Sequence, residues 1–271
     1  MPGTIHYLHN TETGIELIFC TDWCISYPLH NHVSVFTVGI VLEGLLTLTA
    51  NQETKIYKKN QTFSIPPYVP HSISADDSYS LLSLCIPKDI LQRYSMDLIK
   101  NNFKKFLTVL QNTRKIDSLP TEPSLSRSNV LPTEAILAQL DTLPTEPSLS
   151  QLNALPTGFT SARQNSFIVQ LKEQLELHPE DTFRVSSMAQ QAFISKYHFI
   201  RSFKKEVGLT PHQFQIQNRI RKAQRSISKT ETIAEAALLA GFWDQSHFTK
   251  QFEKYVGLTP SDYKRSYHTF S

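Results

Sequence analysis

Short runs of β-branched and aromatic residues, separated by turn residues, dominate the first 87 positions of the chain. Six of these runs are candidate strands: GIELIFC, SVFTVGIVL, LLTLTA, TKIYKK, TFSIP and SLLSLCI. Several short strands at such close spacing are typical of an antiparallel sandwich or barrel. The N-terminal part is therefore predicted to be all-β.

The C-terminal part changes to a helical period and repeats itself. HFIRSFKKEVGLTP at 198–211 returns as HFTKQFEKYVGLTP at 247–260. In each copy two phenylalanines four positions apart mark a buried helical face, and a glycine follows where a helix ends with positive φ. A Thr-Pro pair then begins the next helix. Short helices at 186–195 and 234–244 precede the copies, so each unit has a helix-turn-helix arrangement, and a long helix near 212–227 joins them.

Charge favours a DNA-binding unit over a plain helical repeat. Between positions 182 and 230 there are ten Lys/Arg against one acid, whereas the whole chain carries only +3. Five side chains of the first repeated helix share the face opposite its phenylalanines: Lys196, Tyr197, Ile200, Arg201 and Lys204. Cations suit phosphates and guanine edges, and an aliphatic side chain suits a thymine methyl. From 231 onward four Lys/Arg meet five acids, so we expect the first unit to supply most of the phosphate attraction.

Residues from about 166 to 267 resemble the DNA-binding domain of the AraC/XylS family of bacterial transcription regulators. The resemblance rests on FIRSFKKEVGLTP, on NRIRKA at 218–223 and on GFWDQSHFTKQFEKYVGLTPSDY at 241–263, in that order. It implies two recognition helices that enter successive major grooves on one face of DNA. The positions that match base-facing residues are Lys196, Tyr197, Ile200, Arg201, Gln245, Ser246 and Lys250.

Two N-terminal segments, PLHNHVSVFTVGIVLEG and FSIPPYVPHSI, are similar to the two motifs of a cupin-type jelly roll. Such a jelly roll is the sensor usually fused to this DNA-binding domain. The likeness rests on the spacing of His30, His32, Gly44, Pro67 and His71. It implies a multidomain α+β protein, with an all-β cupin-like jelly roll before an all-α domain. The candidate effector-binding residues are His30, His32, His71, Phe36 and Tyr68.

The same histidines make a metal site the competing hypothesis. A metal-binding cupin also has a Glu four or five residues after its His-x-His, but Phe36 and Thr37 occupy those positions. Three neutral imidazoles could still hold Zn²⁺, yet the missing carboxylate argues against a redox or hydrolytic enzyme. We therefore expect no catalytic residue and no metal. Histidines that hydrogen-bond a polar effector are favoured over purely structural ones.

An amphipathic helix is predicted at 88–111. Its apolar stripe consists of Ile99, Phe103, Phe106 and Leu110. The stripe can pack on its own barrel, which is the commoner outcome, or on a second subunit. Because helices after the sensor often dimerise in the family that the chain resembles, we slightly favour pairing.

A twelve-residue repeat follows, with Leu-Pro-Thr at 119, 131, 143 and 155. Its prolines prevent one continuous helix, and twelve residues with so few leucines bury little surface. We interpret it as a linker with brief helical turns after each Thr, and a small helical appendage docked on the sensor is the alternative. The expected domains are 1–90 (sensor), 91–116 (helical segment, possible dimerisation), 117–160 (linker) and 161–271 (DNA-binding domain).

Composition adds the cellular context. Residues 161–271 carry sixteen Lys/Arg and ten acids, whereas 1–160 carry eleven and fourteen, which fits one domain that meets nucleic acid and one that does not. Three cysteines, an odd number, indicate a reducing compartment rather than a disulfide framework. Neither a signal pattern nor an apolar run long enough to cross a bilayer is present, so we expect a soluble cytoplasmic protein without a membrane partner.

Together these patterns predict a sequence-specific transcriptional regulator, for instance an activator, that binds double-stranded promoter or operator DNA. A small effector in the jelly roll would shift a homodimer toward a geometry that fits two half-sites, and RNA polymerase would be a partner of an activator. No cofactor is expected. One alternative is an effector-independent regulator whose barrel only dimerises. The other is a metal-binding cupin enzyme fused to a DNA-binding domain.

Overall fold

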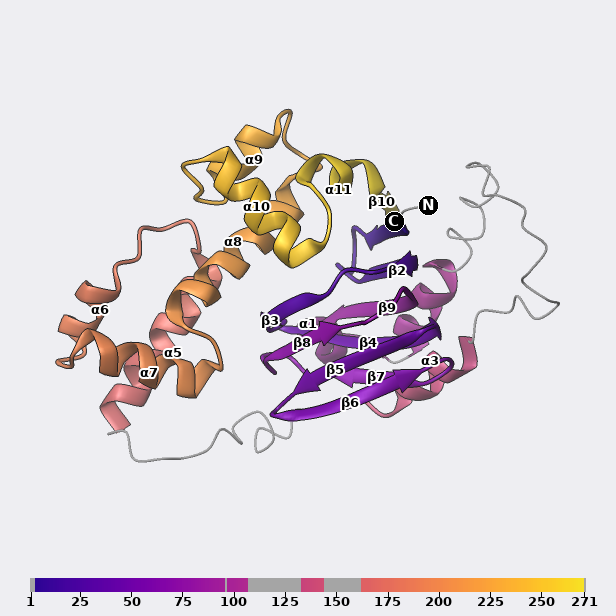
Figure 1. Cartoon of the computed structure of the whole chain (residues 1–271), viewed down its shortest axis with the longest axis horizontal. Helices are drawn as coiled ribbons and strands as arrows, with labels where there is room; N and C mark the ends of the chain where they lie inside the picture. The colour runs from indigo at the N-terminus through magenta and orange to yellow at the C-terminus, as the bar shows by residue number, and fades with distance from the viewer. Residues whose placement is uncertain (1–2, 96, 107–132, 144–161, 271) are drawn as a thin grey trace.

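Two β-sheets and a set of helices make up the computed structural model, which describes residues 3–95, 97–106, 133–143 and 162–270 (Figure 1). The strands are β1 (Thr4–Asn10), β2 (Glu16–Trp23), β3 (Tyr27–His30), β4 (Val35–Glu43), β5 (Leu45–Ala50), β6 (Glu53–Lys58), β7 (Thr62–Ile65), β8 (His71–Ser74), β9 (Tyr79–Pro87) and β10 (Tyr267–Phe270). The helices are α1 (Lys88–Arg93), a helical segment at 97–106, α3 (Thr133–Asp141), α5 (Ala162–Leu177), α6 (Val185–Gln191), α7 (Lys196–Val207), α8 (Pro211–Ser226), α9 (Ile233–Leu239), α10 (Gln245–Val256) and α11 (Pro260–Ser266).

The N-terminal part is a β-sandwich of the jelly-roll type, as predicted. One sheet has the order β10-β1-β2-β9-β4-β7 and the other the order β3-β8-β5-β6. Because β9 lies between β2 and β4, strands distant in the sequence become neighbours, as a jelly roll requires. The hydrophobic pattern of the sequence did not identify the short strands β3 and β8. It also did not identify β1, the first strand in the sequence.

Side chains of the larger sheet point alternately to two apolar cores. One core lies between the two sheets and includes Val41 of β4. The other lies on the opposite face of the larger sheet, includes Phe36 and Val38 of β4, and is called the outer core below. The segment 97–106 covers the outer face and buries Ile99, Phe103 and Phe106 completely in that core. These three residues therefore pack on the chain's own barrel, and the prediction that they pair with a second subunit is wrong. Leu110 lies outside the described residues.

Helix α3 covers the same outer face and comes from the repeats. Ile136, Leu140 and Leu143 are buried in the outer core. Gln139 accepts a hydrogen bond from Thr62 of β7 at 3.0 Å. The part of 117–160 at 133–143 is thus a docked helix and not a linker; the other repeats lie outside the described residues.

The repeats themselves contain the reason why this unit can be helical. It has Ala135 where the units before and after it have Pro123 and Pro147. A proline at 135 would disfavour the helical conformation of Glu134, the second residue of α3, so Ala135 allows the helix to begin at Thr133. Lys100 and Asp141 then join α3 to the segment 97–106 through an ion pair at 2.5 Å.

The C-terminal part is helical except for β10. Helix α8 lies at its centre. Helices α5 and α7 pack against one end of α8, and α9 and α10 pack against the other end (Figure 1). The pairs α6–α7 and α9–α10 are the two predicted helix-turn-helix units. Among the described residues, no helix combines the length and apolarity needed to cross a bilayer.

The local signals for these helices act as expected. Ser195 caps α7 and Asp244 caps α10 by accepting backbone N–H bonds. Gly208 and Gly257 end the same helices with φ of 80° and 83°. Thr210 then forms a capping box that begins α8.

Candidate nucleic-acid interface and effector site

Helix α7 has one buried and one exposed face. Phe199, Ser202, Phe203 and Val207 are buried. On the other face, Lys196, Tyr197, Arg201 and Lys204 are exposed, and Ile200 is half-buried. The structure therefore brings together the predicted DNA-facing residues of the first unit on one helical surface.

Helix α10 presents the corresponding face of the second unit. Phe248 and Phe252 are buried beneath it, while Gln245, Ser246 and Lys250 are exposed. Two of these three side chains are uncharged. The second face is thus suited to hydrogen bonding with base edges more than to attraction of phosphates.

Two aromatic side chains at the turns before these helices are exposed, and the sequence reasoning did not select them. Phe193 is 88 % exposed and Trp243 is 89 % exposed. Phe193 has φ of 56°, a left-handed conformation that Gly241 adopts at the matching position of the second unit. A bulky residue in this region is strained, and that strain was invisible in the sequence.

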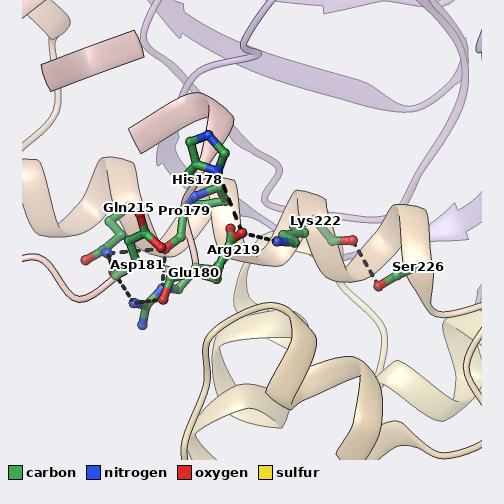
Figure 2. Close-up of polar contacts among 8 residues, drawn as sticks. All are labelled: His178, Pro179, Glu180, Asp181, Gln215, Arg219, Lys222 and Ser226. Carbon is green, nitrogen blue, oxygen red and sulfur yellow. Dashed lines mark hydrogen bonds and ion pairs between the residues drawn. The ribbon is translucent and has the colours of Figure 1, made fainter. Parts of the chain in front are cut away.

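Several cations of α8 serve the fold and not the recognition faces (Figure 2). Arg219 donates through Nε to Pro179 O at 2.7 Å, and Lys222 forms an ion pair with Glu180 at 2.6 Å. Gln215 donates to Asp181 O at 2.9 Å on the same loop. We call these contacts of Gln215, Arg219 and Lys222 with the loop at 179–181 the clamp, because they hold the loop before α6 against α8. The count of ten cations between 182 and 230 therefore overstates the positive charge that is available to DNA.

The clamp also reaches the second unit. A Cβ on Gly241 would lie 2.6 Å from Glu180 Cα and 3.1 Å from Arg219 Nε. The turn between α9 and α10 therefore packs directly on the loop that precedes α6. The two helix-turn-helix units share one frame built around α8.

Both recognition helices also rest on the barrel at their C-terminal ends. A Cβ on Gly208 would lie 2.0 Å from Pro70, and one on Gly257 would lie 2.8 Å from the Tyr27 hydroxyl. The equivalent glycines of the duplicated motif thus contact the sensor domain at two places. Since their opposite ends carry Lys196 and Gln245, the barrel supports the helices at the ends away from those side chains.

Hydrogen bonds and a strand reinforce the junction. Tyr7 and Tyr27 both donate to Val256 O at the end of α10, at 3.0 and 3.4 Å. Strand β10 pairs in parallel with β1. Apolar residues of α8 and α10, including Ile220 and Phe252, belong to the same core as Trp23 of the barrel. The sensor and DNA-binding domains therefore form one continuous apolar core.

The three predicted histidines converge at the barrel end that faces α8. His30 and His71 are register partners on β3 and β8, and His32 follows β3. One ring nitrogen from each lies within 4.8 Å of the others. His30 donates through Nδ1 to Pro28 O at 2.7 Å, and His71 donates to Val69 O at 2.9 Å. Their Nε2 atoms are consequently the unprotonated ones.

Burial and a neighbouring cation keep these imidazoles neutral. Burial lowers the pKa of His30 to about 3 and that of His71 to about 4, and it lowers the pKa of His32 well below its usual value. The Arg221 guanidinium adds to the effect at all three. Thr37, which stands where a carboxylate would complete a cupin metal site, contacts His32 Nδ1 at 2.5 Å. The donor set is therefore three neutral nitrogens, which fits a borderline-soft metal ion without a carboxylate.

Of the other two predicted effector residues, only Phe36 lies apart from this cluster, since the Tyr68 backbone N–H donates to His32 O at 2.7 Å. Phe36 points to the opposite face of its sheet and packs in the outer core, so its assignment to the pocket was wrong. Tyr68 lies at the seam between barrel and α5. Its hydroxyl donates to Glu176 at 3.2 Å, and Lys172 Nζ is 3.4 Å from its ring centroid.

The site also contains residues that sequence reasoning missed. Asn31, between the two histidines of His-x-His, receives a hydrogen bond from Arg221 on its carbonyl at 2.6 Å. Gln217 donates to the Asn31 side chain at 2.5 Å and accepts from its backbone N–H at 3.2 Å. No sequence signal links positions so far apart in the chain, so only the fold could identify this contact.

Two family models match the chain in order. The AraC-like ligand binding domain matches residues 12–143, and the Helix-turn-helix domain matches residues 188–266. The first match includes α3, which agrees with the docking of this helix on the sensor. Together the two models cover strands β2 to β9 and both recognition helices.

Curated relatives are similar to the C-terminal part. The uncharacterized HTH-type transcriptional regulator YbfI of Bacillus subtilis is 34 % identical over 74 residues, which are 27 % of this chain and 27 % of that protein. The HTH-type transcriptional regulator MtrA of Neisseria gonorrhoeae is 35 % identical over 69 residues, 25 % of this chain and 23 % of that protein. The matches thus span about a quarter of the length of each relative.

A solved structure is similar over almost the whole chain. A point variant of apo ToxT from Vibrio cholerae superposes with a TM-score of 0.50 over 95 % of this chain and 98 % of that one, at 11 % identity. At this identity the likeness concerns the fold alone. The order of the two matched family models, with an AraC-like sensor followed by a double helix-turn-helix domain, shows that the chain belongs to the AraC/XylS family.

Proposed function

We propose that this protein is a transcriptional regulator that binds a specific DNA sequence and is controlled through its N-terminal barrel. The observation that carries the proposal is the pair of exposed recognition faces on α7 and α10, which share one frame and one barrel. Each copy of the duplicated motif has two roles. Its helix presents side chains to a major groove, and the glycine that ends the helix packs on the sensor domain.

The two faces have different roles in this proposal. Lys196, Arg201 and Lys204 are exposed on α7, whereas the clamp of α8 uses its cations internally. The first unit would therefore supply phosphate attraction and guanine contacts. The second unit, with Gln245 and Ser246 exposed, would mainly select sequence.

Control through the barrel follows from the shared core. Any ligand that changes the barrel end beneath α8 would alter contacts on which both helices depend. The interdomain hydrogen bonds of Tyr7, Tyr27 and Asn31 support this route over a barrel that serves only for dimerisation. A homodimer on two half-sites, and contact with RNA polymerase if the protein activates, belong to the same proposal.

The proposed compartment is the cytoplasm. Cys20 and Cys85 are buried free thiols, and Cys24 is an exposed one. An exposed thiol is suited to reducing conditions, where chromosomal DNA also lies in a bacterium. The relatives are named as transcriptional regulators, and the proposal includes no catalytic step.

DNA selection tests this function directly. The full chain should enrich one motif from a random duplex pool, and the slope of log affinity against log salt should fall by about one on Lys204→Ala. Lys58→Ala, an exposed lysine on β6, is the matched control and should leave the slope unchanged. Enrichment of no motif, or equal slopes for both variants, would contradict the proposal.

A further inference from the structure

The three-histidine cluster has an arrangement that its structural role does not require. The Nε2 atom of His71 is buried and has no hydrogen-bond partner among the described residues. A buried nitrogen lone pair without a donor costs free energy. One ring nitrogen from each of the three histidines lies within 4.8 Å of the others, so the three imidazoles converge on one small volume.

The hydrogen bonds behind the rings fix the direction of these donors. Carbonyl oxygens of Pro28 and Val69 only accept, so they hold His30 and His71 with the proton on Nδ1. A carbonyl on the far nitrogen is the usual support of a metal-bound histidine, because it sets both tautomer and ring orientation. The Nε2 atoms of His30 and His71 therefore present lone pairs, which attract a cation and repel an anion.

The sequence led us to expect no metal here, but the unpartnered His71 Nε2 within the cluster favours one. We propose that His30, His32 and His71 bind one divalent transition-metal ion of the Zn²⁺ or Co²⁺ type, and that Asn31 transmits its presence to α8. The first half stands on the cluster alone, and the second half rests on the proposed regulatory function. Three nitrogens at a usual Zn–N distance lie about 3.3 Å apart. The ring nitrogens, which lie within 4.8 Å of one another, therefore close by up to about 1.5 Å around the ion.

Asn31 provides the connection because it lies between two of the ligands. Its side chain and backbone are held by Gln217 and Arg221 of α8. Its side-chain amide also donates to Val207 O, at the end of α7, at 3.5 Å. Closing His30 and His32 on an ion displaces the residue that anchors the helix shared by both helix-turn-helix units.

The charge on Arg221 gives the direction of the coupling. Its guanidinium donates to the carbonyl of Asn31 at 2.6 Å, between two of the ligands, so a dication held by His30 and His32 repels it. Metal binding then weakens the Arg221–Asn31 contact, and docked Arg221 weakens metal binding to the same extent. Replacing Arg221 by a neutral residue should tighten the metal site.

Metal binding by the full chain, first freed of metal with a chelator, tests the site. Titration with Co²⁺, followed by its visible absorption, and Zn²⁺ competition against a chromophoric chelator should show one equivalent. His32→Gln should weaken binding by roughly tenfold or more. His178→Gln, which removes a largely exposed histidine of the clamp loop, is the control and should bind like the wild type.

Arg221→Gln separates a built site from an adventitious one. This variant leaves all ligands in place and should bind Zn²⁺ about fivefold or more tightly than the wild type. No Co²⁺ or Zn²⁺ binding by folded wild-type protein would overturn the proposal. Undiminished binding by His32→Gln would also overturn it, since the metal would then occupy a surface site.

A DNA titration tests separately whether metal binding changes the affinity for DNA. On the selected motif, Zn²⁺ should change the affinity of the wild type and have little effect on Arg221→Gln. Stoichiometric metal with no change in DNA affinity would overturn the Asn31 connection. Failure to bind any DNA motif would instead contradict the proposed function and leave the metal isotherms unaffected.

Discussion

Leu140 of α3 decides whether the repeat helix is part of the sensor domain. Its side chain is fully buried in the outer core. Leu→Ala removes about three buried carbons, each of which contributes about 0.8 kcal/mol of transfer free energy. The change also leaves a cavity. We expect Leu140→Ala to lower the free energy of unfolding of the barrel by about 2–5 kcal/mol.

The assay is urea unfolding followed by the fluorescence of Trp23, which is buried in the barrel. Trp243→Phe removes the other, exposed tryptophan, so that the signal reports Trp23 and the core that the barrel shares with α8 and α10. The matched control is Leu137→Ala, because Leu137 is only half-buried on the same helix and should cost about 1 kcal/mol. A loss below about 0.5 kcal/mol for Leu140→Ala, in the range of surface substitutions, would refute the docking and restore a plain linker.

Two further predictions concern strain and pH. Phe193→Gly should stabilise the protein by about 1 kcal/mol, because it relieves a left-handed backbone at an exposed side chain; thermal unfolding that shows no gain would count against strain there. Burial raises the pKa of Glu16 to about 7. Its protonated form therefore stabilises the fold at low pH, and about 1–3 kcal/mol should be lost as pH rises from about 4.5 to about 7.5. Glu16→Gln should flatten this dependence, and an unchanged pH profile would contradict it.

The helical half was predictable because its signals are local. Ser195, Thr210 and Thr259 cap the helices that begin directly after them. Gly208 and Gly257 end the helices directly before them. Periodic phenylalanines identify the buried faces without knowledge of any distant partner. Local physical rules therefore sufficed for both helix-turn-helix units and for the exposed residues on their faces.

The sensor half depends on distant partners. Phe36 and Thr37 are neighbours, yet opposite faces of the sheet separate them, and only strand pairing shows that Thr37 belongs with the histidines. Similarly, Arg219 counted toward the basic charge between 182 and 230, but the fold places Pro179 O beside it. Net charge counts cations and gives no information about which carbonyls they meet.

The repeats contained a signal that the linker interpretation overlooked. Ala135 replaces a proline in the one unit that also has several apolar residues at helical spacing. That difference within the repeat, more than the repeat itself, indicated a docked helix. The pairing expected for Phe103 and its neighbours failed for a related reason: a stripe of this size fits the open face of a barrel as well as a second subunit.

The unequal roles of the two recognition helices are the central claim, and one set of binding isotherms tests it most directly. Arg201→Ala and Lys250→Ala are compared with the wild type on the selected motif and on random DNA at several salt concentrations. We expect Arg201→Ala to cost about 1–3 kcal/mol on the motif, and Lys250→Ala to change base preference at one end of the site with a smaller loss on random DNA. Undiminished binding by Arg201→Ala, or equal losses on random DNA from both variants, would contradict the account.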